Sequence, residues 1–508
     1  MPRTPHFSFF TFYFLLITLF SFLVSCASPA SSPTPVGLTV TPNPNATVTP
    51  TPFGPLATPT ETSTPSATPI PAPERPQYTL FATFDYDAHH LSVEQTILCP
   101  NQTGETLDNL LLAVEANTWP GSFILDSLTV DGQASTAYTL DGQRLEINLS
   151  EPLAPGAMLT LGLKFQLTLP RRDVNTDPND VRPQIYGWTA QASNLTHWFP
   201  FIVPYLSGQG WLLHNPWFYG EHLVYDVADF EVNLRFTDAA RAPVVAASAS
   251  GESNGEWTRY RLEKARTFAL STSREYAVKS QTAGAVTVYS YFYPYFRQAG
   301  EAALQASAQA VQAFSEQFGG YPHTSLSVVQ ADFNDGMEYS AFFFLPRNFY
   351  NLYDGTPKNY LTFISAHETA HQWWFELVGN DQALEPWLDE ALCTYSERIF
   401  YEESYPDLVD WWWAYRVDSF APAGWVNIRV YDGGGFRPYT DAVYLRGAHF
   451  LEALRQRIGD EAFFAFLKDY AAQMAFERST AADFFAILRQ HTSVDISDII
   501  GKYFKDSQ

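Results

Sequence analysis

The sequence predicts a multidomain α+β protein in which an antiparallel β domain precedes a mainly helical domain. Between Tyr78 and about residue 280, short alternating or β-branched runs are separated by turn pairs such as Asp141-Gly142. From Ala302 onward, apolar residues recur at helical spacing. The chain has 508 residues, of which 46% are hydrophobic, so it can build more than one core.

Composition excludes one class of function and restricts the chemistry of any metal site. Asp and Glu number 54 against 30 Lys and Arg, and the net charge of −24 repels nucleic-acid phosphates, so we expect no nucleic-acid partner. The three cysteines, Cys26, Cys99 and Cys393, are too few and too scattered for a disulfide framework or a zinc knuckle. We expect Cys99 and Cys393 to be buried thiols. A metal would therefore be bound by histidines and carboxylates.

Residues 1–26 have the pattern of a secretory signal. Arg3 precedes an apolar run from about Phe7 to Val24, which is short for a membrane span and typical of a signal-peptide core. The run ends in Leu23-Val24-Ser25-Cys26, which resembles the lipobox of bacterial lipoprotein precursors, where the cysteine is acylated. We expect Cys26 to be a lipid anchor. An uncleaved single-span anchor is the alternative, and both place the rest of the chain outside the cytoplasm, at the membrane.

Residues 27–77 predict a disordered linker. They contain 14 of the 35 prolines and 11 threonines, and their only charged residues are Glu61, Glu74 and Arg75. This composition cannot form a core, and its Pro-Thr pairs favour extended polyproline II segments. The linker would hold the folded part away from the membrane surface.

Residues 78–280 predict an N-terminal β domain, either a sandwich or a saddle-like sheet. A hairpin is indicated around the Asp141-Gly142 turn. The other strands are longer runs of β-forming residues. The expected strands are Thr136–Leu140, Arg144–Leu149, Met158–Leu169, Tyr225–Phe236 and Trp257–Glu263.

Residues 281–508 predict the helical domain. Strands are expected at Val286–Phe292 and Ser325–Gln330. The first helix is Ala- and Gln-rich and ends before Gly319-Gly320. The expected helices are Ala302–Phe318, Tyr360–Leu377, Trp387–Glu402, Tyr444–Ile458, Glu461–Gln473 and Ala481–Arg489.

A metal-binding pattern lies in the second of these helices. His367-Glu368-Thr369-Ala370-His371 is an H-E-x-x-H motif, and the i, i+4 spacing places both imidazoles on one helical face. Eighteen residues separate His371 from Glu390, which lies on the next predicted helix and can supply a third ligand. Two imidazoles and one carboxylate leave a fourth position open, which is typical of catalytic zinc.

These motifs resemble those of the gluzincin zinc peptidases, the family of aminopeptidase N and leukotriene hydrolase. Glu390 stands in a Trp-Leu-x-Glu context, as in that family, with Ala391 where the family has Gly. Asp335-Gly336-Met337-Glu338-Tyr339 matches the family's Gly-x-Met-Glu-Asn segment, and Tyr444-Leu445-Arg446-Gly447 matches its Tyr-x-Lys-Gly segment. The resemblance implies a thermolysin-like catalytic domain after the β domain and one zinc ion per chain.

The resemblance also implies roles for individual residues. Glu368 would be the general base, and Tyr444 would donate a hydrogen bond to the oxyanion. Glu338 would bind the α-ammonium group of a peptide substrate, which directs cleavage to the first peptide bond. Glu397, seven residues after Glu390, matches a family glutamate that supports a ligand histidine.

One departure from the family pattern leaves alternatives open. Tyr339 replaces the Asn that helps to align the substrate. We expect a membrane-anchored, extracytoplasmic zinc aminopeptidase acting on peptides. The alternatives are a zinc oligopeptidase or endopeptidase with a weakened amine anchor, and a surface binding module with a relict site. The intact set of His367, Glu368, His371, Glu390 and Tyr444 argues against the last.

Overall fold

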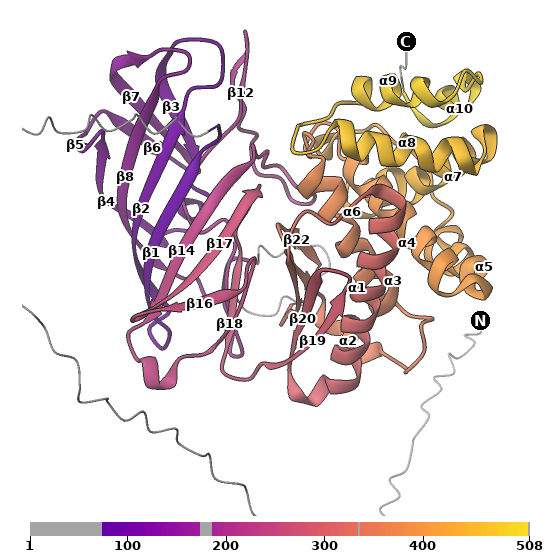
Figure 1. The fold of residues 1–508 in the computed structure, drawn as a ribbon, viewed down its shortest axis with the longest axis horizontal. Coiled ribbons are helices and arrows are strands. Elements are labelled where there is room, and N and C mark those ends of the chain that lie inside the picture. The colour runs from indigo at the N-terminus through magenta and orange to yellow at the C-terminus, as the bar shows by residue number, and fades with distance from the viewer. Residues whose placement is uncertain (1–73, 173–184, 334–335, 506–508) are drawn as a thin grey trace, which may run out of the picture. The chain divides into compact units, whose positions relative to one another are not determined.

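The computed structural model describes residues 74–172, 185–333 and 336–505. The expected signal peptide with Cys26, nearly all of the expected linker, and Asp335 lie outside these residues. The described part comprises an N-terminal β domain and a C-terminal, mainly helical domain (Figure 1). The expected fold class is therefore confirmed.

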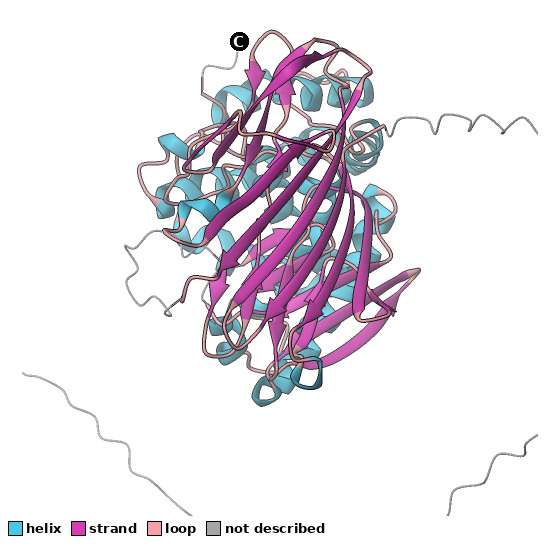
Figure 2. Ribbon diagram, turned by 90° about the vertical axis from the view of Figure 1, so that its left-hand side faces the viewer, coloured by secondary structure: helices cyan, strands magenta, loops and turns pink. Residues whose placement is uncertain are grey.

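A large twisted sheet dominates the β domain (Figure 2). Alternate residues of its strands are buried, as in the pattern of β8, because one face packs on the core and the other meets solvent. Strand β1 runs antiparallel to β2 and parallel to β14. In spatial order the strands are β16 (Gly251–Asn254), β17 (Trp257–Ala265), β14 (Ala228–Phe236), β1 (Gln77–Asp85), β2 (His90–Pro100), β8 (Met158–Thr168), β4 (Phe123–Val130) and β5 (Gln133–Ala134).

Smaller sheets complete the β domain. Buried leucines of β3 and β7 share one hydrophobic core with Phe84 and Phe165 of the large sheet, so the domain is layered. The hairpin expected at Asp141-Gly142 is formed by β6 and β7. The strands are β11 (Phe201–Ile202), β3 (Leu107–Ala113), β7 (Arg144–Leu153) and β6 (Tyr138–Asp141) in one sheet, β15 (Val244–Ala247), β18 (Leu270–Ser273), β10 (Ser193–Leu195) and β9 (Gly187–Trp188) in another, and the pair β12 (Tyr205–Leu206) and β13 (Gly210–Trp211).

A mixed sheet opens the second domain. Its order is β19 (Ala277–Ala283), β20 (Val286–Phe292), β21 (Ser325–Gln330), β23 (Phe342–Leu345) and β22 (Met337–Tyr339). The boundary expected at residue 280 lies within β19, which pairs with β20. The central strands are parallel, whereas β22 runs antiparallel to β23 at the edge. This edge strand carries Glu338.

Helices pack beside this sheet, and α1 contacts α3, which carries the H-E-x-x-H motif. None of the helices in the described part of the chain combines the length and apolar character of a bilayer-spanning segment. The helices are α1 (Arg297–Phe318), α2 (Arg347–Leu352), α3 (Tyr360–Ala370), α4 (Trp387–Ser404), α5 (Val409–Trp412), α6 (Phe436–Thr440), α7 (Arg446–Ile458), α8 (Asp460–Gln473), α9 (Ala481–His491) and α10 (Ser497–Tyr503).

Two of the expected helices are interrupted beside the functional residues. The helix expected at Tyr360–Leu377 ends at Ala370, because the wide turn Gln372–Leu377 contains the non-helical residues Trp374 and Phe375. Tyr444 lies in a π-helical turn, Asp441–Leu445, rather than inside α7. Such turns are frequent near functional sites because they redirect side chains.

Candidate active site

Three side chains converge on one point between α3 and α4. His367 and His371 lie one helical turn apart at the end of α3, and Glu390 lies in the first turn of α4. The Oε2 atom of Glu390 is 3.2 Å from Nε2 of His367 and 3.8 Å from Nε2 of His371. The three ligand atoms all lie within 4.8 Å of one another, a spacing that one metal ion can bridge.

Each histidine is oriented by a carboxylate behind it. Nδ1 of His367 lies 3.0 Å from Oε1 of Glu397, and Nδ1 of His371 lies 2.7 Å from Oδ1 of Asp389. These contacts fix the tautomer that leaves both Nε2 atoms free to bind a metal. The contact of Glu397 is the one that the family resemblance implied, whereas Asp389 was not predicted.

Glu397 is itself held by a buried network. Its carboxylate accepts hydrogen bonds from Nε of Arg416 at 2.9 Å and from the indole of Trp412 at 2.9 Å. Burial alone would raise the pKa of Glu397, but Arg416 and His367 lower it below its ordinary value. The carboxylate is therefore ionised, which makes the attached imidazole a stronger metal ligand.

Glu368 faces the same point as the ligand atoms. It is buried, and its Oε2 atom has no hydrogen-bond partner within the described residues. Burial raises its pKa to about 8. A Cβ atom at position 336 would come within 2.5 Å of Oε1 of Glu368, which explains why a glycine stands there.

The donor set fits a divalent cation. Glu368 and Glu390 are both buried carboxylates, and burial raises the pKa of each above its ordinary value. A cation between them would favour their ionised forms. Imidazole and carboxylate ligands with one open position are those of catalytic zinc.

Tyr444 lies beside the first ligand histidine. Its ring is nearly parallel to that of His367, with 6.0 Å between the ring centroids. Burial raises the pKa of the Glu390 carboxyl well above its ordinary value, and a hydrogen bond from the Tyr444 hydroxyl opposes this rise. The phenol can therefore reach a group bound at the open metal position.

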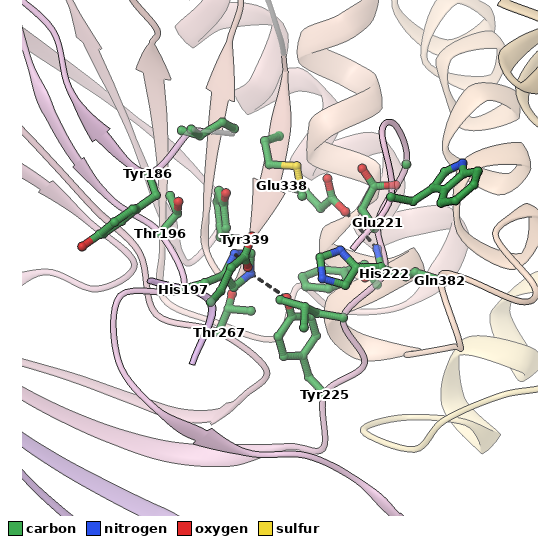
Figure 3. A pocket seen from close by; sticks show the side chains of 17 residues that line it. Tyr186, Thr196, His197, Glu221, His222, Tyr225, Thr267, Glu338, Tyr339 and Gln382 are labelled. Atoms are coloured by element: carbon green, nitrogen blue, oxygen red, sulfur yellow. Dashed lines mark hydrogen bonds and ion pairs between the residues drawn. The ribbon is translucent and has the colours of Figure 1, made fainter. Parts of the chain in front are cut away.

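Glu338 projects from β22 into a pocket that Glu221 and Tyr339 also line (Figure 3). One of its oxygens accepts a hydrogen bond from Nε2 of Gln382 at 3.1 Å. The ligand atoms of Glu338, Glu368 and His371 lie within 4.8 Å of one another. Burial raises the pKa of Glu338 well above its ordinary value, and the nearby Glu221 raises it further.

Glu221 could not be found from the sequence. It belongs to the segment before β14, in the β domain, and lines the pocket beside Glu338 (Figure 3). No motif surrounds it, so only the packing of the β domain against the second domain brings the two carboxylates together. Tyr339 also lines the pocket and is 2% exposed.

The predictions for the two described cysteines are confirmed, since Cys99 and Cys393 are buried and free. Burial raises the pKa of the Cys393 thiol well above its ordinary value. This thiol packs near Asp389 and does not have the character of a nucleophile.

Comparison with known proteins agrees with this geometry. Residues 302–503 match the model of the peptidase family M1 domain. The matched residues include all three candidate metal ligands, and the match agrees with the metallopeptidase class expected from the sequence.

The curated sequences that this chain resembles are aminopeptidases. Aminopeptidase M1-D of Oryza sativa subsp. japonica is 23% identical over 41% of this chain and 25% of its own length. Aminopeptidase N of Streptomyces lividans is 26% identical over 26% of this chain and 16% of its own length. The chain thus spans about a quarter or less of the length of these relatives.

Solved structures resemble the whole described fold. An M1 zinc metallopeptidase from Deinococcus radiodurans has a TM-score of 0.62 at 18% identity, over 85% of this chain and 94% of its own. A two-domain M1 zinc metallopeptidase bound to L-tryptophan has a TM-score of 0.61 at 18% identity, over 87% of this chain and 97% of its own. The arrangement of a β domain followed by a mainly helical domain is therefore a known two-domain fold.

Proposed function

We propose that this chain is a zinc-dependent aminopeptidase that hydrolyses the first peptide bond of peptides. One observation carries the proposal. The carboxylate of Glu338 lies within 4.8 Å of ligand atoms of Glu368 and His371. A substrate whose α-ammonium binds this carboxylate would place its first peptide bond beside the general base and the metal position.

His367, His371 and Glu390 would hold one zinc ion per chain. When bound, zinc polarises the scissile carbonyl and lowers the pKa of water to about 7. The solved M1 zinc metallopeptidases with this two-domain fold support the choice of metal.

The chain's own residues perform the remaining steps. Glu368 would accept a proton from the attacking water and pass it to the leaving amine, since its Oε2 has no other partner among the described residues. Tyr444 would donate its phenolic hydrogen to the oxyanion as the carbonyl becomes tetrahedral. Glu338, with Glu221 beside it, would bind the α-ammonium in a buried acidic pocket.

A comparison of free and acetylated substrates tests the proposal. A charge-assisted contact of this kind contributes roughly 1.5–3 kcal/mol, which is about 10- to 150-fold in kcat/KM. Peptide anilides with a free amino group should exceed their acetylated counterparts by at least about tenfold, and Glu338→Ala should remove most of this difference. Equal hydrolysis of both substrates refutes the aminopeptidase assignment.

The other functions considered from the sequence become outcomes of the same assay. Preferential cleavage of internal bonds would favour an oligopeptidase, in which Tyr339 has weakened the alignment of the amino terminus. No hydrolysis by the zinc-loaded protein would favour a binding module with a relict site. Metal analysis should find about one zinc per chain in the active protein.

For location, we propose a lipoprotein anchored through Cys26 on the outer side of a membrane. The support is the lipobox-like sequence after a short apolar run. Stable anchoring needs two or more acyl chains, as lipoprotein acylation provides. Cys26→Ser should abolish metabolic labelling with a fatty acid, and unchanged labelling contradicts the proposal.

A further inference from the structure

Glu376 is a fully buried carboxylate that the proposed reaction does not use. It lies in the wide turn after α3. Its Oε2 atom accepts a hydrogen bond from the hydroxyl of Ser340 at 2.5 Å, and its Oε1 atom lies 2.6 Å from Nε2 of His323. Ser340 is two residues from Glu338, so Glu376 contacts the chain directly after the strand that carries the amine anchor.

The wide turn brings two side chains to that strand. Trp374 (φ −102°, ψ 58°) leaves the helical conformation, and the chain then directs Glu376 toward Ser340. Gln372, the residue after His371, uses both ends of its amide. Its Nε2 donates to the carbonyl of Tyr339 at 3.0 Å, and its Oε1 accepts from the backbone N–H of Ala341 at 2.8 Å.

The segment that follows His371 therefore contacts three consecutive residues, 339, 340 and 341. The strand before them needs this support. β22 has only three residues and lies at the edge of the sheet, where it pairs with β23 alone among the described strands. An edge strand of this length is weakly held by its own ladder.

The β domain contacts the same serine from the other side. The hydroxyl of Ser340 accepts hydrogen bonds from the backbone N–H groups of Arg266 at 3.0 Å and Thr267 at 2.9 Å. The backbone N–H of Ser340 donates to Oγ1 of Thr267 at 2.9 Å. The Thr267 hydroxyl is a third donor at 3.2 Å, so with Glu376 as its acceptor the Ser340 hydroxyl is fully hydrogen-bonded.

We propose that Ser340 and Glu376 are positioning residues that fix the amine anchor Glu338 relative to the metal ligands. They join the end of β22 to the segment after His371 and to the β domain. This inference rests on the proposed role of Glu338. Because a shift of about 1 Å in the bound geometry can reduce turnover by about 10²-fold, loss of the link should be measurable in the rate.

The test uses Ser340→Ala and Glu376→Gln in the zinc-loaded protein. For each, kcat/KM is measured on leucine p-nitroanilide and on N-acetyl-leucine p-nitroanilide, together with the zinc content. We expect the free-amine value to fall by about 10- to 100-fold, with the acetylated value within about twofold and the zinc content unchanged.

Ser290→Ala is the matched control. Ser290 is a fully buried serine of the same sheet, and its hydroxyl donates to the carbonyl of Gly300 at 2.9 Å, away from β22. This variant loses a buried hydroxyl of the same kind, so it reports what a general loss of stability does to both substrates. Its ratio of free-amine to acetylated rates should equal that of the parent.

The outcomes separate this inference from the proposed function. A parent protein with no preference for the free amine refutes the role of Glu338, and the positioning inference falls with it. If the parent prefers the free-amine substrate and Ser340→Ala and Glu376→Gln keep this preference, the positioning inference alone is overturned. An equal fall in kcat/KM on both substrates also overturns it. If Ser340→Ala does not fold, the near-isosteric Glu376→Gln decides.

Discussion

Glu397→Gln should weaken zinc binding without removing a ligand. The carboxylate lies 3.0 Å from Nδ1 of His367 and also accepts hydrogen bonds from Trp412 and Arg416. An amide of the same size loses the negative charge, and its NH₂ group must face one of these donors. Loss of such a supporting carboxylate typically costs 10- to 100-fold in metal affinity, or about 1.4–2.7 kcal/mol.

The measurement is a competition titration against a chromophoric chelator. Glu452→Gln is the matched control. Glu452 accepts a hydrogen bond from the hydroxyl of Tyr395, which lies on α4 as Glu397 does, but Glu452 contacts no metal ligand. The control should bind zinc like the parent. If Glu397→Gln, shown by circular dichroism to be folded, also binds zinc with the parent's affinity, the role assigned to Glu397 is refuted.

Three further perturbations test catalysis and stability. Glu368→Gln should retain zinc and lose nearly all turnover, because the ligands remain while the base is lost, and a turnover near the parent's contradicts this role. Tyr444→Phe should lower kcat by roughly 10²–10³ with little change in KM, so an unchanged kcat removes this tyrosine from the mechanism. Burial would raise the pKa of Glu402, but hydrogen bonds and charge from Arg455 and Arg398 lower it below 4.5. The ion pair therefore stabilises the folded state above about pH 4.5, and protonation removes this stability as the pH falls through the folded-state pKa. In urea titrations at pH 7, Glu402→Gln should lower the free energy of unfolding by about 1 kcal/mol, after allowing for partial exposure. The difference in this free energy between variant and parent should be smaller at pH 4. If this difference is the same at pH 4 and pH 7, the stabilising role of the Glu402 ion pair is refuted.

The candidate metal ligands could be predicted from the sequence because the motif that contains the histidines is local. His367 and His371 are separated by one helical turn, so periodicity places them on one face, whereas Glu390 reaches them because α4 packs against α3. The two central strands of the second domain, β20 and β21, were also predicted with their observed bounds. In each case a continuous pattern of residues carries the signal.

The rest of the site depends on contacts between distant segments. Glu221, from the β domain, lines the same pocket as Glu338, the proposed amine anchor. The residues next to Glu221 in the sequence form no motif. The apolar residues from Gln372 to Leu377 continue a helical pattern, so the break after Ala370 is set by tertiary contacts such as those of Glu376. The parallel pairing of β1 with β14 is likewise a product of the assembled sheet.

The environment of Arg266 has a consequence for how the two domains can evolve. This β-domain guanidinium is 4% exposed and donates to the backbone carbonyls of Glu376 at 2.9 Å and Glu477 at 2.8 Å in the second domain. A side chain at Gly379 would occupy its place, since a Cβ atom there would lie 2.4 Å from the guanidinium carbon. Recombination that joined the second domain to a β domain lacking the arginine would remove this donor from the buried carbonyl of Glu376. The two domains should therefore be inherited as a pair.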